Sequence, residues 1–204
     1  MNKGELRTHF KALLNRSDCS NALADTFIDQ SIARIQRTLR IPPMERQQVY
    51  TILNDQPQDY IILPADFLEV MDIYYDGQCL TRKPLRDMVS LRSNGEQGSP
   101  IYFAREQGSI LLHPTPSSGS IYLNYYGQFD DLVADTDEND LSVIAPDAVV
   151  YGALAYASDY FIDERGMLFE QKFTTFLSEL QTQANEAETA GTVQAITPMA
   201  SYQD

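Results

Sequence analysis

Apolar residues recur at helical spacing near both ends of the chain. Two stripes with the 3.6-residue period of an amphipathic helix lie before residue 40, and two more follow residue 146. The stripes comprise Leu6, Phe10, Leu13 and Leu14; Ile28, Ile32, Ile35 and Leu39; Val150, Ala153, Leu154, Ala157 and Phe161; and Phe169, Phe173, Phe176, Leu177 and Leu180. We predict four helices. Pro42–Pro43 ends the second, and a turn at Asp163–Gly166 separates the last two.

Between Arg46 and Phe129 the pattern is that of short β-strands. Asp76-Gly77 stands between two apolar runs, which predicts a tight hairpin, and Glu106–Gly108 predicts a second one. Apolar and polar residues alternate from Ile121 to Tyr126, as in a strand with one buried face. One short helix is predicted at Leu85–Leu91.

The order of helices, then strands, then helices predicts an α+β fold rather than an alternating α/β fold. We expect a helical module of N- and C-terminal helices with an inserted antiparallel β subdomain, because helix-on-helix packing buries all four stripes. The expected boundaries are 1–45 plus 141–189 for the helical module, 46–129 for the β subdomain, 130–140 for an acidic loop and 190–204 for an extended C-terminal arm.

Charge is unevenly distributed over the 204 residues. The chain has 15 Lys and Arg against 29 Asp and Glu, a net charge of −14; residues 1–50 have a net charge of +3 and residues 51–204 have a net charge of −17. Such a chain lacks the clustered cations that grip nucleic-acid phosphates, although DNA can still slide past it. The hydrophobic content of 43% excludes wholesale disorder, and no apolar run reaches the length of a membrane helix.

Motifs of catalysis are not found. The sequence contains no GxGxxG, GxxxxGK[ST] or GxSxG pattern, and its two histidines, His9 and His113, are far apart. Cys19 and Cys79 have neither the spacing of a metal pair nor the number needed for a disulfide framework. We therefore expect no catalytic, cofactor or metal site. A reducing cytosolic origin suits the cysteine usage.

The loop 130–140 partly matches the pattern of a calcium-binding loop. Asp135, Asp137 and Asn139 occupy ligand positions 1, 3 and 5 of a calcium loop, but Asp140 and Pro146 stand where the pattern needs Gly and Glu. A solvated acidic loop fits better. Its acids are Asp130, Asp131, Asp135, Asp137, Glu138 and Asp140.

Several segments occur in an order typical of one protein family. They are Phe27–Arg40, Pro42–Glu45, Leu63–Val70 (LPADFLEV), Gly98–Phe103 (GSPIYF), Leu111–Pro116 (LLHPTP), Leu123–Tyr126 (LNYY) and Leu154–Ala157 (LAYA). In this order the chain resembles the head-to-tail adaptor proteins of tailed bacteriophages over most of residues 22–185. Residues 1–21 and 190–204 lie outside the resemblance.

The resemblance implies a structural virion protein without cofactor or reaction. Such adaptors form a ring, commonly of twelve copies, that docks beneath the portal, extends the DNA channel and presents a platform for tail or nozzle proteins. The expected location is the virion neck or tail, with host cytoplasm during assembly and no membrane partner. DNA would pass without sequence-specific binding, and the six acids of loop 130–140 are candidates for facing the channel.

The C-terminal residues 190–204 are apolar but have no helical period, and Pro198 disfavours one. We expect an arm that becomes ordered against the portal or a neighbouring subunit. Its expected contact residues are Val193, Ile196, Pro198, Met199 and Tyr202. An ordinary frayed terminus is the alternative.

Two other functions stay open on sequence grounds. The first is another neck or tail-tube component, which would bind tail subunits instead of the portal. The second, more remote, is a hydrolase that uses paired carboxylates, because any acidic chain offers such pairs. Zymography on peptidoglycan would separate the hydrolase from both structural roles.

Overall fold

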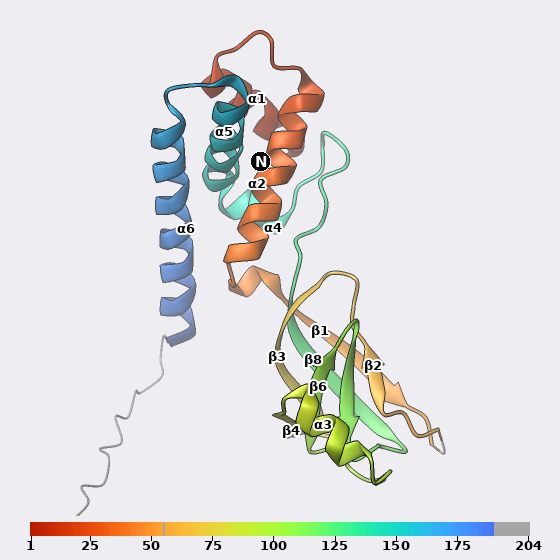
Figure 1. Ribbon diagram of the computed structural model, residues 1–204. Helices are drawn as coiled ribbons and strands as arrows, with labels where there is room; N and C mark the ends of the chain where they lie inside the picture. Colours follow the sequence, from red (N-terminus) through yellow and green to blue (C-terminus); the bar gives the residue numbers. More distant parts are fainter. Residues whose placement is uncertain (55, 190–204) are drawn as a thin grey trace, which may run out of the picture. The chain divides into compact units, whose positions relative to one another are not determined.

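The computed structural model describes residues 1–54 and 56–189 (Figure 1). Its helices are α1 (Lys3–Leu14), α2 (Asn21–Thr38), α3 (Leu85–Arg92), α4 (Asp140–Ile144), α5 (Pro146–Phe161) and α6 (Gly166–Thr189), with a 3₁₀ turn at Pro42–Met44. Its strands are β1 (Glu45–Ile52), β2 (Tyr60–Ile62), β3 (Phe67–Tyr75), β4 (Gln78–Cys79), β5 (Thr81–Arg82), β6 (Tyr102–Glu106), β7 (Ser109–His113) and β8 (Gly119–Gly127). The predicted α+β class, with helices at both ends and strands between them, is confirmed.

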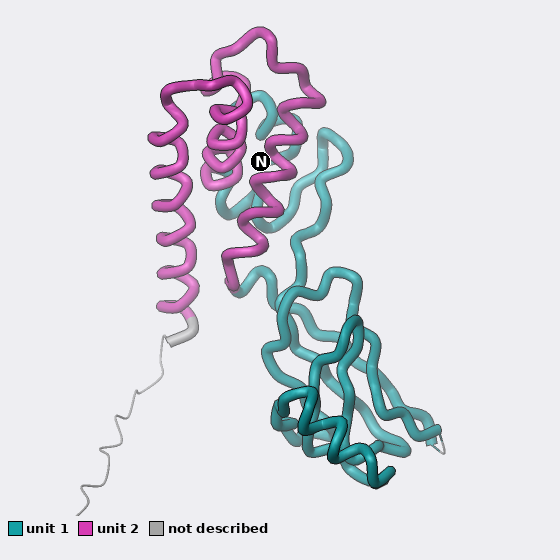
Figure 2. Tube along the Cα trace, in the orientation of Figure 1, with its two compact units in different colours: residues 1–9, 42–146 teal, residues 10–41, 147–204 magenta. Residues whose placement is uncertain are grey.

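The chain folds as two compact units (Figure 2). The first, called the β-unit below, comprises Met1–His9 and Pro42–Pro146. The second, the helical unit, comprises Phe10–Ile41 and the chain from Asp147 onward. Residues 1–9 and the loop 130–140 thus belong to the same unit as the strands.

The β-unit is built on two four-stranded sheets whose inner faces share one core. The first sheet has the order β1-β8-β3-β4 and the second has the order β2-β7-β6-β5. Alternate residues of each strand point inward, as the period of two requires. The buried residues of this core are Ile52, Ile61, Ile73, Leu80, Phe103, Ile110, Leu112, Ile121, Leu123 and Tyr125.

Both predicted hairpins are present. Asp76 and Gly77 have φ of 45° and 86°, the left-handed values that a type I′ turn needs at both central positions, and they join β3 to β4. Gly108, with φ of 74°, closes the turn between β6 and β7. Helix α3, also predicted, packs Met88 against Ala104 and Leu111 on the outer face of the second sheet.

Three features differ from the sequence prediction. The apolar residues that begin at Val49 lie in a longer strand, β1, which begins at Glu45; its first residues are mostly exposed and polar, so the apolar pattern does not show them as strand. Helix α4 was not predicted; a capping box between Asn139 and Ser142 starts it. The pair β5–β6 is parallel, in a subdomain expected to be antiparallel.

In the helical unit, α2, α5 and α6 pack through a continuous apolar core. Ile28, Ile35, Leu154 and Phe173 are fully buried. Ser20 caps α2 by accepting a hydrogen bond from the Leu23 amide at 3.2 Å. Figure 1 shows α5 and α6 side by side, and the Tyr151 ring lies 6.2 Å from Phe169 and 5.6 Å from Phe176.

At Gly152 these helices lie close together. A Cβ there would overlap the Ser31 hydroxyl and would lie 2.7 Å from the Phe173 ring. Both neighbours are fully buried, and Ser31 donates a hydrogen bond to the Val149 carbonyl at 2.8 Å. Neither neighbour has room to move, so the glycine is required by packing.

We predict that Gly152→Ala lowers the free energy of unfolding by up to about 2 kcal/mol. Overpacking a core costs about 1–3 kcal/mol, and the better helix propensity of Ala returns about 1 kcal/mol of that cost. Chemical denaturation measures it. Adding Ser31→Ala removes the nearest atom and should recover part of the loss; a stabilised single variant would contradict the packing described.

Candidate interaction surfaces

Potential metal ligands do not gather in residues 1–54 and 56–189. No group of three or more His, Cys, Asp or Glu side chains in that part of the chain is placed to hold a metal ion. Within the same residues, no helix is both long and apolar enough to cross a membrane. Cys19 is buried and Cys79 is exposed, in different units. His113 is buried on β7, and His9 is exposed.

The acidic loop 130–140 lies against the first residues of the chain, within the β-unit. Arg7 holds the Asp135 carboxylate through two hydrogen bonds, of 2.7 Å and 3.1 Å. This guanidinium keeps the pKa of Asp135 below its ordinary value. The Lys3 ammonium donates to the Leu132 carbonyl at 2.7 Å, so the loop is tied at two points.

The remaining acids of the loop divide into two kinds. Asp137 accepts hydrogen bonds from the backbone amides of Val133 and Ala134, at 3.0 Å and 2.7 Å. Glu138 lies 3.7 Å from the Met1 amino group, and Asp140 lies 3.9 Å from Arg46. Asp130 and Asp131 are exposed. The six predicted acids thus lie together on one loop, but four of them make contacts inside their own unit.

The expected arm residues Val193, Ile196, Pro198, Met199 and Tyr202 lie outside the described residues.

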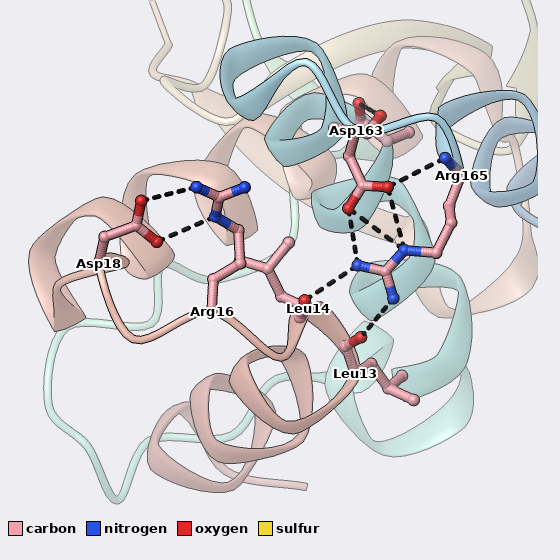
Figure 3. Close-up of polar contacts among 8 residues, drawn as sticks. Leu13, Leu14, Arg16, Asp18, Asp163 and Arg165 are labelled. Atoms are coloured by element: carbon pink, nitrogen blue, oxygen red, sulfur yellow. Dashed lines mark hydrogen bonds and ion pairs between the residues drawn. The ribbon is translucent and has the colours of Figure 1, made fainter.

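A second candidate surface, which the sequence did not reveal, is the end of the helical unit shown in Figure 3. We call it the stapled end: residues Leu13–Ser20, from the end of α1 to the start of α2, and Tyr160–Leu168, from the end of α5 into the first turn of α6. The last carbonyls of a helix have no partner within the helix. At the end of α1, the Arg165 guanidinium donates to the Leu13 and Leu14 carbonyls, at 3.2 Å and 2.9 Å.

Asp163 completes the staple. Its carboxylate accepts three side-chain hydrogen bonds from Arg165, the shortest of 2.6 Å, and one from the Arg165 amide at 3.0 Å. Chiefly through the guanidinium, these bonds lower the pKa of Asp163 from 3.8 to about 2. The turn between α5 and α6 is therefore joined by charge-assisted bonds to the end of α1.

Aromatic packing supports the other side of the stapled end. Arg16, itself paired with Asp18 at 2.8 Å and 2.9 Å, stacks over the Phe161 ring at 4.5 Å. Phe161 contacts Phe27 and Tyr160 edge to face. The backbone of both turns is thus held from two directions.

Four large apolar side chains project from this rigid end. Ile162 is 91% exposed and Met167 is 85% exposed. Tyr160 and Leu168 are also exposed. Ile162 has a φ of 55°, a left-handed conformation that a β-branched residue rarely adopts.

The conformation of Ile162 follows from how α5 ends. The Asp163 amide donates to the Ser158 carbonyl at 2.9 Å, the bond of a Schellman motif. In that motif the residue at the position of Ile162 takes a left-handed conformation and is usually glycine. Here the position is occupied by an isoleucine that gains no burial in its own chain.

A cleft of about 790 Å³ lies beside the stapled end, between α5 and α6. Arg34 of α2 crosses its floor, where it pairs with Glu170 at 2.5 Å and 2.9 Å and stacks over Phe173 at 4.6 Å. The guanidinium lowers the pKa of Glu170. The lining has no His, Cys or Lys, and the Ser158 hydroxyl donates to the Ala155 carbonyl, so the cleft offers no activated nucleophile.

We predict that Asp163 makes the stability of the protein depend on pH in the acid range. Since its folded pKa lies below the ordinary value, the unfolded chain takes up the proton more readily. The contribution of Asp163 is therefore complete above about pH 4 and is lost as the pH falls towards about 2. The stability difference between wild type and Asp163→Asn should shrink over that window in denaturant titrations.

Asp159→Asn is the control, because Asp159 is exposed nearby and has no bond to Arg165. A wild-type-to-Asp163→Asn difference that stays constant from pH 5 to pH 2 would show that the staple carries no linked proton.

Comparison with known proteins identifies the family of the chain. No curated protein matches it. The family model described as SU10 adaptor protein matches residues 1–196, which includes both compact units and both candidate surfaces. The chain belongs to the SU10 adaptor protein family of phage head-to-tail adaptors.

Proposed function

We propose that this phage adaptor forms a ring beneath the portal, docks there through the stapled end of its helical unit, and lets DNA pass through the ring to the tail. Membership of the family supports the general role, since an adaptor connects portal and tail components in the virion neck. The observation that carries the choice of docking surface is the exposed, left-handed Ile162.

The left-handed conformation of Ile162 is energetically unfavourable. A left-handed β-branched residue costs about 1–2 kcal/mol relative to a right-handed one, and burial offsets none of it here because the side chain lies in water. Such strain persists when the surroundings impose it and is often found where a protein binds a partner. The Schellman motif at the end of α5 imposes it here, and the staple of Arg165 and Asp163 holds the residue that follows Ile162.

Rigidity makes this surface suitable for docking. Because the turn is already ordered, contact with a partner costs little further chain entropy. Tyr160, Ile162, Met167 and Leu168 together supply aromatic, aliphatic and thioether groups, and aromatic residues and Met are enriched in interface cores. We assign the portal as the occupant, because a head-to-tail adaptor must hold a fixed partner on its head side.

The acidity of the chain supports the conduit part of the proposal. With a net charge of −14, the protein repels DNA at a distance, so a channel wall made of it does not retain the polymer. Asp130 and Asp131 are the acids of loop 130–140 that we place first for facing the channel. Arg7, Arg46 and the amino terminus already balance much of the charge of the others.

Residues 190–204 complete the proposal as an arm to the portal or a neighbouring copy. Their composition supports this role, because a segment that contains Val193, Ile196, Met199 and Tyr202 is too apolar for a solvated linker. Fifteen extended residues reach at most about 50 Å, enough to cross onto an adjacent protein.

We predict that Ile162→Gly separates stability from assembly. The free energy of unfolding should stay unchanged or rise by up to about 1 kcal/mol, because glycine adopts the left-handed conformation without strain. Affinity for the portal should fall by at least about tenfold, because a central apolar contact is lost. Denaturant titration and portal co-sedimentation measure the two effects.

Val133→Gly is the matched control: Val133 is also β-branched and 80% exposed, but lies in the β-unit. Portal binding by Ile162→Gly at wild-type strength would remove the stapled end from the interface. Binding to tail subunits alone would instead favour another neck or tail-tube role.

A chain truncated after Gly191 tests the arm. It should keep the circular dichroism and the unfolding midpoint of the full chain, because the described helices are intact, yet bind the portal or assemble less. Unchanged assembly would reduce residues 190–204 to a frayed terminus.

A further inference from the structure

The outer face of the first sheet of the β-unit is an uncovered surface rich in tyrosine. We call it the tyrosine face. The strand register arranges it in rows: Glu45, Tyr126 and Glu69; then Gln47, Asn124 and Asp72; then Val49, Tyr122 and Tyr74. All of these side chains lie opposite the core residues Ile121, Leu123 and Tyr125, because neighbours along a strand point to opposite faces.

Hydrogen bonds across the strands confirm this arrangement. The Gln47 amide donates to Asn124 at 2.8 Å, and the Asn124 amide donates to Asp72 at 2.5 Å. This polar ladder joins three strands through the middle row. Beside it, Val49 is 43% exposed and Tyr122 is 37% exposed. The charged residues in these rows are Glu45, Glu69 and Asp72, so the face is acidic.

A basic surface lies elsewhere in the same unit. We call it the basic patch: Arg82 and Lys83 at β5, Arg86 in the first turn of α3, and Arg105 of β6. It contains four of the chain's 15 Lys and Arg residues. A hollow of about 370 Å³ is lined by Arg82, Lys83, Pro84, Leu85 and Arg105, and so contains cations and no acid.

The cations of the patch are not neutralised in their own chain. Among the residues that the structure describes, none of the four forms an ion pair with a carboxylate, whereas Arg7, Arg34 and Arg165 all do. Two of them are positioned by rings instead: Lys83 lies 4.8 Å from the Tyr102 ring and Arg105 lies 5.1 Å from Phe67. Leu85 and Val89 of α3 add exposed apolar area.

The two surfaces are formed by different elements: the tyrosine face by β1, β8 and β3, and the basic patch by β5, α3 and β6, with Arg105 reaching the Phe67 ring at the beginning of β3. Helix α3 packs through Met88 on the outer face of the second sheet, and the tyrosine face is the outer face of the first. One copy can therefore offer its tyrosine face to one neighbour and its basic patch to another. A contact between two different surfaces of the same protein repeats from copy to copy and closes into a ring when the rotation allows.

We infer that neighbouring copies of this chain associate head to tail, with the acidic tyrosine face of one against the basic patch of the next. The inference rests on the proposed ring and names the surfaces that build it. Opposite charge orients the two copies, while Tyr122, Val49, Leu85 and Val89 supply apolar and aromatic area.

A nucleic-acid role for the patch is the main competitor. Phosphate binding would use Arg82, Lys83, Arg86 and Arg105 without the exposed Leu85 and Val89 beside them. A chain with a net charge of −14 also repels DNA as a whole. A second copy of the same acidic chain, in contrast, supplies an opposite charge on a defined surface.

The test reverses the charge on each surface separately and then on both. Lys83→Glu with Arg86→Glu makes the patch acidic, and Glu45→Lys with Glu69→Lys makes the tyrosine face basic. Each pair should weaken assembly on the portal, measured by mass photometry, by at least about tenfold. A chain with all four changes carries both reversals, so attraction is restored and assembly should return to within about threefold of wild type.

Two further variants make the result decisive. Arg37→Glu, an exposed reversal in the helical unit, is the control and should assemble normally. If Glu45→Lys with Glu69→Lys fails to fold by circular dichroism, Val49→Lys with Thr51→Lys places the same charge on the same face.

The outcomes separate the two proposals. A wild-type chain that does not assemble on the portal overturns the proposed function. Two results overturn only the head-to-tail contact. In the first, the wild-type chain forms a ring and both charge-reversal pairs assemble as well as it does. In the second, the chain with all four changes folds but does not assemble. If Lys83→Glu with Arg86→Glu assembles normally but loses retention of DNA in low-salt gel shifts, the patch is a phosphate site and the inference is wrong.

Discussion

The organisation of the helical unit depends on Arg165 more than on any other polar residue described. Its guanidinium satisfies two carbonyls at the end of α1 and holds Asp163 at the start of the turn into α6. The last carbonyls of a helix have no partner within the helix. Here one side chain provides that partner and joins two loops that are about 150 residues apart in sequence. The apolar side chains beside it are consequently presented on fixed backbone, and an interface can use them without first ordering them.

Charge has a different role in each part of the molecule. In the acidic loop it is used locally, since Arg7 and the amides of Val133 and Ala134 hold the carboxylates in place. In the basic patch the four positive charges form no ion pair with a carboxylate of the described residues, although the protein has about twice as many acids as bases. Association with an acidic surface of another copy, as proposed above, neutralises them.

The features that could be predicted from the sequence are those set by neighbouring residues. Asp76-Gly77 needs only its own backbone preference to make a turn, and the helical stripes need only their period. The family resemblance of the ordered segments agrees with the family match over residues 1–196.

The features that were missed depend on distant partners or on exceptions to a preference. The contact of Arg7 with Asp135 joins positions 128 residues apart, and no local pattern announces it. Ile162 makes the C-terminus of α5 hard to predict, because the residue expected at this left-handed position is glycine. The predicted turn at Asp163–Gly166 is the local indication that the helix ends here. Helix α4 is too short for a period and is defined by the bonds between Asn139 and Ser142.

The polar ladder of Gln47, Asn124 and Asp72 has a consequence for how the sheet can fail. A slip of one residue between β1 and β8 would turn Gln47 toward the core, where its amide would lose Asn124 and meet mainly aliphatic and aromatic side chains. Misaligned pairings are therefore penalised by a buried, unsatisfied amide, in addition to the loss of apolar burial. The ladder thus works as an alignment key for three strands, and every copy of the protein displays the same rows of side chains at the same spacing.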